Sequence, residues 1–167
     1  VWGSNSNYQL GTGNSTNYSS PVQIGALTNW LSVSSGNYHS NAVKTDGTLW
    51  AWGRGFLGAL GNGGTASKSS PVQIGGLTTW LQTASGYAFT MGITTAGTLY
   101  AWGYNTQGNL GIGNNTNQSS PVQVGALTTW ASVSGGNIFS AAVKTDGTLW
   151  AWGWNDQGQL GQGNTTQ

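Results

Sequence analysis

The sequence is poor in charge and contains no cysteine. Its 167 residues include four Lys or Arg, three Asp and no Glu, so charged residues make up 4% of the chain, against roughly 25% in a typical soluble domain. Four scattered cations exclude a surface that follows nucleic-acid phosphates, which needs clustered Lys and Arg. They also argue against binding to anionic membranes. Without cysteine, no disulfide or thiolate metal site can form.

Groups for catalysis or metal binding are equally scarce. General acid–base chemistry needs His, Asp, Glu or Lys in perturbed surroundings, and the chain has one His and no Glu. Three scattered Asp make no obvious calcium loop. We therefore expect a protein that is not an enzyme and that has no catalytic residues, no metal site and no cofactor. No apolar run approaches the roughly 20 residues that a membrane-spanning helix needs, so we expect no membrane insertion.

Aromatic residues are abundant, with 10 Trp and 6 Tyr. Disordered chains are poor in such residues, and buried aromatic rings offset the entropy lost when a chain becomes ordered. The low charge is thus no sign of disorder, and we expect a folded chain whose surface is hydrated by Asn, Gln, Ser, Thr and Gly.

Internal repetition dominates the sequence. Three short motifs recur with a spacing of 50 residues: Trp-Gly from Trp2, Trp52, Trp102 and Trp152; Ser-Ser-Pro-Val-Gln from Ser19, Ser69 and Ser119; and Leu-Gly from Leu10, Leu60, Leu110 and Leu160. The chain opens in the middle of a unit and has no initiator Met, which favours a piece of a longer polypeptide.

Each unit contains four short segments typical of strands. In the first unit they are residues 22–24, which follow a proline, residues 30–33, residues 40–44 and residues 48–52. Asp46-Gly47 and Asp146-Gly147 favour tight hairpins, for which a type I′ turn needs positive φ at both central residues. Ala96-Gly97 stands at this place in the second unit, so we interpret the two aspartates as turn residues.

The segment Leu49-Trp50-Ala51-Trp52 is apolar on both of its alternating faces. Burial on both faces is typical of a blade packed between two neighbouring blades. We therefore predict an all-β fold: β-propeller blades of four antiparallel strands on a 50-residue repeat, with about 3.3 blades in the chain. Units in register cover residues 1–50, 51–100 and 101–150, with a partial unit at 151–167, in a single partial propeller.

The residues from Gly36 to Gly53, followed by Leu60-Gly61-x-Gly63 and Pro71-Val72, resemble the regulator of chromosome condensation repeat. The resemblance covers the whole chain and implies a propeller that is commonly seven-bladed. The signatures of kelch and WD-type propellers are missing. An open array of about 3.3 blades leaves two edges unpaired, so either further sequence or several copies of the chain would close the ring. The start in the middle of a repeat favours further sequence.

Positions that are the same in every unit are assigned to packing and turns. The predicted core and turn residues are Trp30, Asp46, Gly47, Trp50, Trp52, Trp80, Trp102, Trp130, Asp146, Gly147, Trp150 and Trp152. The glycine pairs that begin at Gly11, Gly61, Gly111 and Gly161 lack the Lys and the helix start of a phosphate loop. We interpret them as aids to sharp turns and close blade packing.

Positions that vary between near-identical units are free of such constraints. The candidate partner-contact residues are Tyr38, His39, Arg54, Phe56, Tyr104, Asn105, Trp154 and Asn155. Drift without selection explains the same variation, and His39 can equally be a filler beside a turn, because Phe89 and Phe139 hold its place in the later units.

The leading hypothesis for function is a rigid, non-enzymatic display module that contacts a partner through the loops of its rim. We expect an extracellular, cell-surface or virion setting, as in bacterial surface proteins or phage fibres. One alternative is a glycan-binding lectin that uses Trp154, Tyr104 and the Asn-rich loops. A second alternative, implied by the family resemblance, is a guanine-nucleotide exchange factor or a chromatin-associated module.

Overall fold

The structure is a computed structural model that describes residues 1–166, and its regular elements are strands apart from one short 3-10 helix, η1 (Phe56–Gly58). The first sheet contains β1 (Trp30–Ser35), β2 (His39–Lys44), β3 (Leu49–Gly53) and β4 (Lys68–Gln73). The second contains β5 (Trp80–Ser85), β6 (Phe89–Thr94), β7 (Leu99–Gly103) and β8 (Gln118–Gln123). The third contains β9 (Trp130–Gly135), β10 (Phe139–Lys144) and β11 (Leu149–Gly153).

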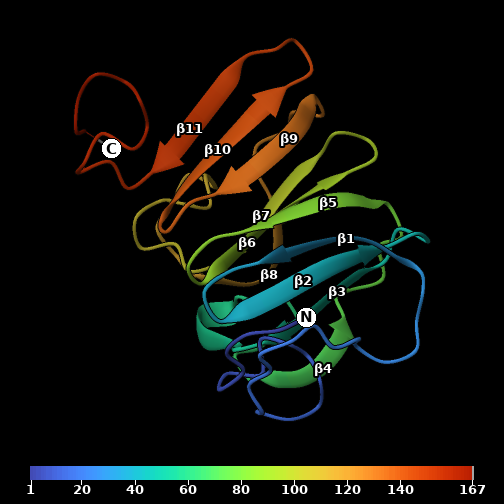
Figure 1. Cartoon of the computed structure of the whole chain (residues 1–167). Coiled ribbons are helices and arrows are strands. Elements are labelled where there is room, and N and C mark those ends of the chain that lie inside the picture. The colour runs from blue at the N-terminus through green and yellow to red at the C-terminus, as the bar shows by residue number, and fades with distance from the viewer. Residues whose placement is uncertain (167) are drawn as a thin grey trace.

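All strand pairs are antiparallel, and each strand pairs with its neighbour in the sequence. The three sheets follow one another in space as they do in the chain, from β1–β4 to β9–β11 (Figure 1). The first strands of the three sheets, β1, β5 and β9, lie next to one another. These strands therefore form the inner side, and the sheets are arranged around it. This is the predicted propeller arrangement. No helix in the described part of the chain is long and apolar enough to cross a membrane.

The outermost strand of each complete sheet comes from the next repeat unit, which the sequence did not predict. The segment after the proline was grouped with the strand that follows it, but β4 pairs with β3 of the preceding unit, with Ala51 opposite Val72. The sheets therefore span residues 30–73 and 80–123 and cross the unit boundaries. Pro71 lies inside β4, where a shift of register and the edge position accommodate its missing N–H.

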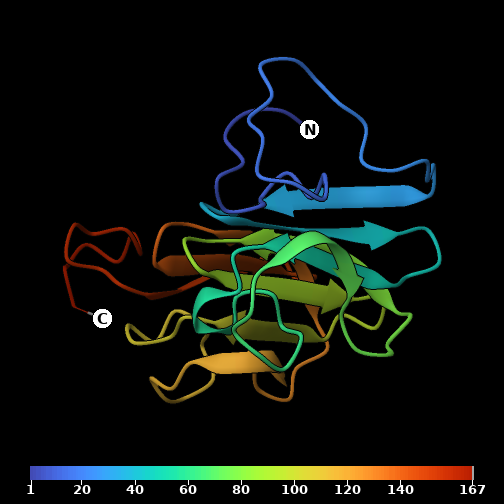
Figure 2. The same cartoon turned by 90° about the horizontal axis from the view of Figure 1, so that it is seen from below.

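The N-terminal residues form the outer part of a further blade. Val1 and Val22 exchange two backbone hydrogen bonds of 2.8 Å, and Gly3 bridges Tyr18. These pairs correspond to the pairing of Ala51 with Val72 and of Gly53 with Lys68 between β3 and β4. Residues 22–24, which were predicted as a strand, are held by this short pairing and are not part of a named strand. The N-terminal segment lies at one end of the stack of sheets (Figure 2).

The hairpin turns confirm the role of Asp46 and Asp146 but differ from the predicted type. Gly47 has φ of 75°, whereas Asp46 is absent from the described residues with positive φ, so the turn is not type I′. The Gly47 N–H donates to the Lys44 carbonyl and the Lys44 N–H to the Thr48 carbonyl. This is a three-residue loop that needs positive φ only at its last residue. Asp46 Oδ1 accepts hydrogen bonds from the Thr48 N–H and hydroxyl.

The core lies between the sheets. On one face of the first sheet, Val43 and Leu49 pack with Trp80 and Trp102 of the second sheet. The second sheet repeats the arrangement, because Ile93 and Leu99 belong to the same cluster as Trp130. Leu49 and Leu99 are completely buried. The equivalent Leu149, on the last sheet, is 73% exposed, so the outer face of this sheet presents the apolar residues of an interface without a neighbour.

A recurring contact connects each loop to the sheet that follows it. The Trp102 indole N–H and the Thr90 hydroxyl both donate to the Ala59 carbonyl, at 3.1 and 3.0 Å. A Cβ on Gly61 would lie 2.6 Å from the Trp102 ring, which no side chain could accommodate. The same bonds reach the carbonyls of Gln9 and Asn109 in the neighbouring units. The prediction of close blade packing is therefore confirmed for Gly11, Gly61 and Gly111, whereas a Cβ on Gly161 or on the second glycine of each pair would meet no atom closer than 3.6 Å.

Two of the three sheets carry a lysine against their tryptophans. The Lys44 ammonium lies 3.8 Å from the centre of the Trp50 ring and 5.0 Å from that of Trp30, and Lys144 repeats the arrangement. In the second sheet Thr94 and Tyr100 replace this pair. The lysine and the tryptophan thus change together between units. Trp150 meets Trp130 edge to face, with ring centres 6.3 Å apart, as Trp50 meets Trp30, and it is half exposed on β11.

We predict that Lys44 and Trp50 stabilise each other. In a double-mutant cycle of Lys44→Thr and Trp50→Tyr, which introduces the residues of the second sheet, we expect a coupling of about 1 kcal/mol, because a partly buried cation–π pair contributes roughly 0.5–2 kcal/mol. The free energy of unfolding, from denaturant titration of the four proteins, measures it. Additive effects of the two substitutions would contradict the prediction.

Candidate interaction surface

The fold places one variable residue at the same site in each sheet. The N–H groups of Arg54, Tyr104 and Trp154, each of which follows the third strand, donate to the carbonyl of the residue before the second strand, at 2.8, 2.9 and 3.0 Å. The backbone is therefore repeated, while the side chains differ completely. At this edge of the sheets, the side chain changes from arginine to tyrosine to tryptophan while the backbone hydrogen bond stays the same.

At the first two sheets, four variable side chains form a cluster that we call the aromatic–arginine cluster: Tyr38, Arg54, Phe56 and Tyr87. The Arg54 guanidinium carbon lies 4.7 Å from the centre of the Phe56 ring and 5.5 Å from that of Tyr38. Tyr38 and Tyr87 meet edge to face, with ring centres 5.8 Å apart. Predicted contact residues from two loops are thus brought together, and the pair of tyrosines joins the first sheet to the second.

Phe56 owes its position to a local change in one unit. Gly55 stands where Asn105 and Asn155 stand in the later units, and a Cβ there would lie 2.5 Å from the Ala66 carbonyl oxygen. The chain then makes the short helix η1, in which Leu57 has φ of 55°. Phe56 is 41% exposed at its start. The second unit therefore departs from the common loop to present an aromatic ring.

Asn105 and Asn155 do not belong to this surface, and their prediction as contact residues was wrong. Both are completely buried. Asn105 Oδ1 accepts a hydrogen bond from the Leu110 N–H, and its amide donates to the Asn114 carbonyl; Asn155 makes the equivalent bonds. Asn5 has the same role in the first unit. An asparagine at the same repeat position in three places, Asn5, Asn105 and Asn155, was the signal in the sequence that this side chain organises the loop.

His39 was also wrongly predicted as a contact residue, and its alternative as a filler beside a turn is confirmed. The side chain is 1% exposed, and its Nε2 lies 2.9 Å from the Thr90 hydroxyl of the next sheet. A Cβ on Gly36 would lie 2.6 Å from the ring, so the turn is shaped around it. Burial, partly opposed by a hydrogen bond with the Phe89 backbone, lowers the pKa of His39 to about 4.

The remaining predicted contact residues are partly accessible. Trp154 is half-buried at the third sheet, and Tyr104 packs against the core cluster beneath it. Tyr87 was missed by the sequence analysis, although it differs from Asn37 and Asn137 at the same position. The signal was variation between units, which also identified Tyr38. In the repeat, the position of Tyr87 comes one residue before the position of Tyr38.

Acidic groups take no part in the cluster. Asp46 and Asp146 lie in the hairpin turns, where hydrogen bonds from the hydroxyl and then the N–H of Thr48 and Thr148 lower the pKa of each carboxyl. Among residues 1–166, no three His, Cys, Asp or Glu side chains are grouped closely enough to hold a metal ion. The described surface is therefore suited to stacking, apolar contact and a single cationic contact.

Comparison with known proteins assigns the repeat. A family model described as the regulator of chromosome condensation (RCC1) repeat matches residues 1–43, 46–93 and 96–143, and a second with the same description matches residues 30–59, 80–109 and 130–159. Among curated proteins, the X-linked retinitis pigmentosa GTPase regulator homolog of Caenorhabditis elegans is 40% identical over 62 residues, which are 35% of this chain and 4% of that protein.

Solved structures show the same fold. Yeast RCC1 (Prp20) bound to Kap60 is 22% identical, with a TM-score of 0.84 over 97% of this chain and 41% of that chain. Prp20p from Saccharomyces cerevisiae, described with its binding properties to Gsp1p and histones, is 23% identical, with a TM-score of 0.80 over 96% of this chain and 42% of that chain. The chain thus spans about two fifths of the length of these structures.

The burial of His39 predicts a pH-dependent stability. Its folded pKa of about 4 lies below the unfolded value of 6.5, so the unfolded chain binds the proton more tightly, and stability is lost as the pH falls from 6.5 to 4. We expect a loss of about 3 kcal/mol in the free energy of unfolding from this residue.

The substitution His39→Phe, which introduces the residue of the other two sheets, should remove most of this dependence. Denaturant titrations of both proteins between pH 7 and pH 4 measure it. A residual slope from Asp46 and Asp146 should remain in both, because their lowered pKa values also favour unfolding in acid. Equal slopes for the two proteins would contradict the assignment to His39.

Proposed function

Because the chain belongs to the regulator of chromosome condensation (RCC1) repeat family, we propose that it is a non-enzymatic module that binds a protein partner through the aromatic–arginine cluster. The supporting observation is that Tyr38, Arg54, Phe56 and Tyr87 all differ from the residues at the same positions in the other units, and yet meet in one place.

The chemistry of the cluster indicates what a partner would offer. The described residues include no carboxylate in an ion pair with Arg54, whose guanidinium lies over the rings of Phe56 and Tyr38. We propose that its N–H donors bind an external acceptor. A planar guanidinium that is stacked on aromatic rings binds a carboxylate with little loss of side-chain freedom. Arginine and aromatic residues are also those that dominate protein interfaces. We propose an acidic segment with a neighbouring apolar side chain as the bound element.

The setting belongs to the same proposal. With 4% charged residues and a surface of amides and hydroxyls, the chain suits extracellular or virion display, where few sites for trypsin-like proteases are an advantage. The related Prp20p is described with binding to Gsp1p and histones. The present chain has too few charges to offer histones or DNA an extended electrostatic surface.

The glycan-binding alternative loses part of its basis. It relied on Trp154, Tyr104 and the Asn-rich loops, but Asn105 and Asn155 are buried and have their hydrogen bonds inside the chain. The two accessible rings, Tyr104 and Trp154, lie on different sheets. Neither has the side-chain amide of Asn105 or Asn155 beside it on the surface, because both amides are buried.

We predict that the cluster is the preferred site for peptide ligands. A random peptide library displayed on phage and panned against the immobilised chain should enrich acidic sequences with an aromatic or aliphatic residue. Arg54→Ala should weaken their binding about tenfold or more, because a charge-assisted hydrogen bond contributes roughly 1.5–3 kcal/mol. Biolayer interferometry with the enriched peptides measures the change.

Lys68→Ala is the matched control, since it removes one positive charge from β4 at a residue that takes no part in the ring contacts of the cluster. Phe56→Ala should weaken binding without altering its salt dependence. Enriched peptides that bind wild type, Arg54→Ala and Phe56→Ala equally would refute the proposal. A glycan array and a nucleotide-release assay with a small GTPase test the two alternatives directly.

A further inference from the structure

The inner strands of the first two sheets, β1 and β5, lie side by side (Figure 1) and are joined by polar side chains. The Asn41 amide donates to the Ser85 hydroxyl at 2.6 Å, and the Ser85 N–H donates to the Ser34 hydroxyl at 3.0 Å. Asn41 is completely buried. Met91 and Ala84 stand at the positions of Asn41 and Ser34 in the second sheet, so this polar layer belongs to the first interface and is not repeated at the second.

Three buried oxygen atoms in this layer have no hydrogen-bond partner within residues 1–166: Asn41 Oδ1, Ser32 Oγ and Thr83 Oγ1. Side chains alternate between the two faces of a strand, so Ser32 shares a face of β1 with Ser34. In the same way, Thr83 shares a face of β5 with Ser85. Ser34 and Ser85 are in contact, and β1 and β5 are equivalent strands of successive units. The side chains two residues earlier, Ser32 and Thr83, therefore lie beside each other, and Asn41, which pairs with Ser34, completes the group.

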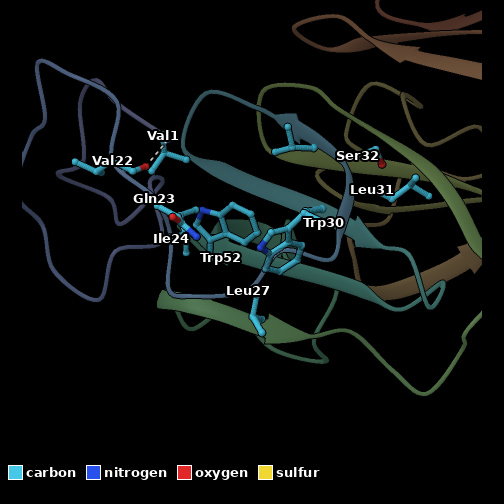
Figure 3. A pocket seen from close by; sticks show the side chains of 11 residues that line it. Val1, Val22, Gln23, Ile24, Leu27, Trp30, Leu31, Ser32 and Trp52 are labelled. Atoms are coloured by element: carbon cyan, nitrogen blue, oxygen red, sulfur yellow. Dashed lines mark hydrogen bonds between the residues drawn. The ribbon is translucent and has the colours of Figure 1, made fainter.

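The opposite face of β1 borders an apolar pocket. Val33 lines this pocket of about 360 Å³ together with Trp30 and Trp52 (Figure 3). Ser32 borders the same pocket, but its hydroxyl oxygen is buried. Its partner in β2 is Val43, which packs against the second sheet. The Ser32 hydroxyl therefore belongs to the interface between the first two sheets.

A ligand for this layer must offer both a donor and an acceptor. The Ser32 and Thr83 hydroxyls each have a proton to donate, whereas Asn41 Oδ1 can only accept. If the Asn41 amide is turned round, its N–H group becomes the unpaired end, so one end of this side chain needs a partner in either orientation. Buried polar groups in folded proteins are paired with protein atoms or with ordered water.

The second interface has a side chain at the corresponding place. Gln82, which has the repeat position of Ser32, donates from its side-chain amide to the Ala131 carbonyl at 2.8 Å and so links β5 to β9. The counterpart of Ala131 on β5 is Leu81. The shorter side chain of Ser32 makes no such bond within the described residues. A small molecule bound beside Ser32 would therefore occupy, at the first interface, the position of the Gln82 amide group.

We propose that Ser32, Asn41 and Thr83 bind one ordered water molecule between β1 and β5. Water can accept hydrogen bonds from the two hydroxyls and donate one to Asn41 Oδ1, and about three hydrogen bonds are typical of a water molecule inside a protein. A monovalent cation suits the site less well, because it would leave both hydroxyl protons without an acceptor. It would also be a buried charge without a counter-ion, since the three Asp side chains of the chain are exposed.

This water makes the first interface chemically different from the second. At the second interface, Met91 and Val133 hold the positions of Asn41 and Thr83 and pack in an apolar cluster. An apolar face offers no partner to the oxygens of the first sheet, so the first sheet should pair with the second sheet in preference to the third. None of the water-binding residues belongs to the aromatic–arginine cluster, so this site does not depend on the function proposed above.

The substitution Thr83→Val, which introduces the residue of the third sheet, tests the hydrogen bond to water. It removes one hydroxyl and keeps the shape of the side chain. If the hydroxyl bonds to water, the folding equilibrium constant from denaturant titration should fall about fivefold, whereas removal of an unpaired buried hydroxyl would leave it unchanged or raise it. Ser32→Ala should have the same effect. The matched control is Ser132→Ala, at the same repeat position but exposed on β9, which should change the constant about twofold or less.

Nuclear magnetic resonance detects the water directly. In the wild-type chain, nuclear Overhauser cross-peaks should connect the Asn41 side-chain amide with a long-lived water molecule, and Thr83→Val should weaken them. Ser32→Gln introduces the residue of the second sheet, whose amide group should replace the water. The cross-peaks should then disappear while the folding equilibrium constant stays within about threefold of the wild-type value, because a direct hydrogen bond and a water-mediated one are of similar strength.

Three results would overturn the proposal: no water cross-peaks at Asn41 in the wild-type chain, a Thr83→Val variant as stable as the wild type, or water cross-peaks that survive Ser32→Gln. Replacing sodium chloride by tetramethylammonium chloride tests for a bound cation. Unchanged stability supports the water, and a loss of stability without sodium would assign the site to the cation instead.

Discussion

The structure depends on the attachment of each loop to the tryptophan of the next sheet. The indole N–H of Trp52, Trp102 or Trp152 donates to a carbonyl in the loop of the preceding unit, and a glycine two residues later allows the ring to lie against the backbone. A buried indole N–H usually finds a hydrogen-bond acceptor, and a loop has carbonyls without strand partners to offer. One contact therefore satisfies both groups and fixes the spacing between sheets, which explains why these positions are the same in every unit.

Constancy at these contacts makes variation elsewhere informative. The repeated N–H to carbonyl bond at Arg54, Tyr104 and Trp154 holds the backbone whatever the side chain, so the surface can change its chemistry from sheet to sheet without a loss of packing. Burial separates the two kinds of variable position. His39 varies because an aromatic-sized side chain of any chemistry fills the space above Gly36, whereas Phe56 varies at the surface, where nothing in the sheet requires a ring.

The parts that could be predicted from the sequence are those set by local chemistry. The Asp-Gly pairs predicted the turns and the strands β2 and β3 on either side of them, and the apolar run Leu49–Trp52 predicted that β3 is buried, because these signals depend on neighbouring residues. The fourth strand was assigned to the wrong sheet because its partner lies some 20 residues earlier, and a strand alone does not indicate with which edge it pairs. The contact between Tyr38 and Tyr87 joins two sheets and has no signature within either segment. Asn105 and Asn155 were misjudged because comparison with Arg54 and its neighbours concealed their agreement with Asn5.

Because the repeat units are nearly identical, the same segment occurs at several places in the chain. Misassembly between similar units is a characteristic failure of repeat proteins, and divergence between units would let a segment fit its own neighbours better than those of another unit. Here the segments at residues 19–23, 69–73 and 119–123 are identical, and the loops before them make the same hydrogen bonds. Side-chain chemistry therefore does not assign each of these segments to its own sheet, and the length of the connecting loop does so instead.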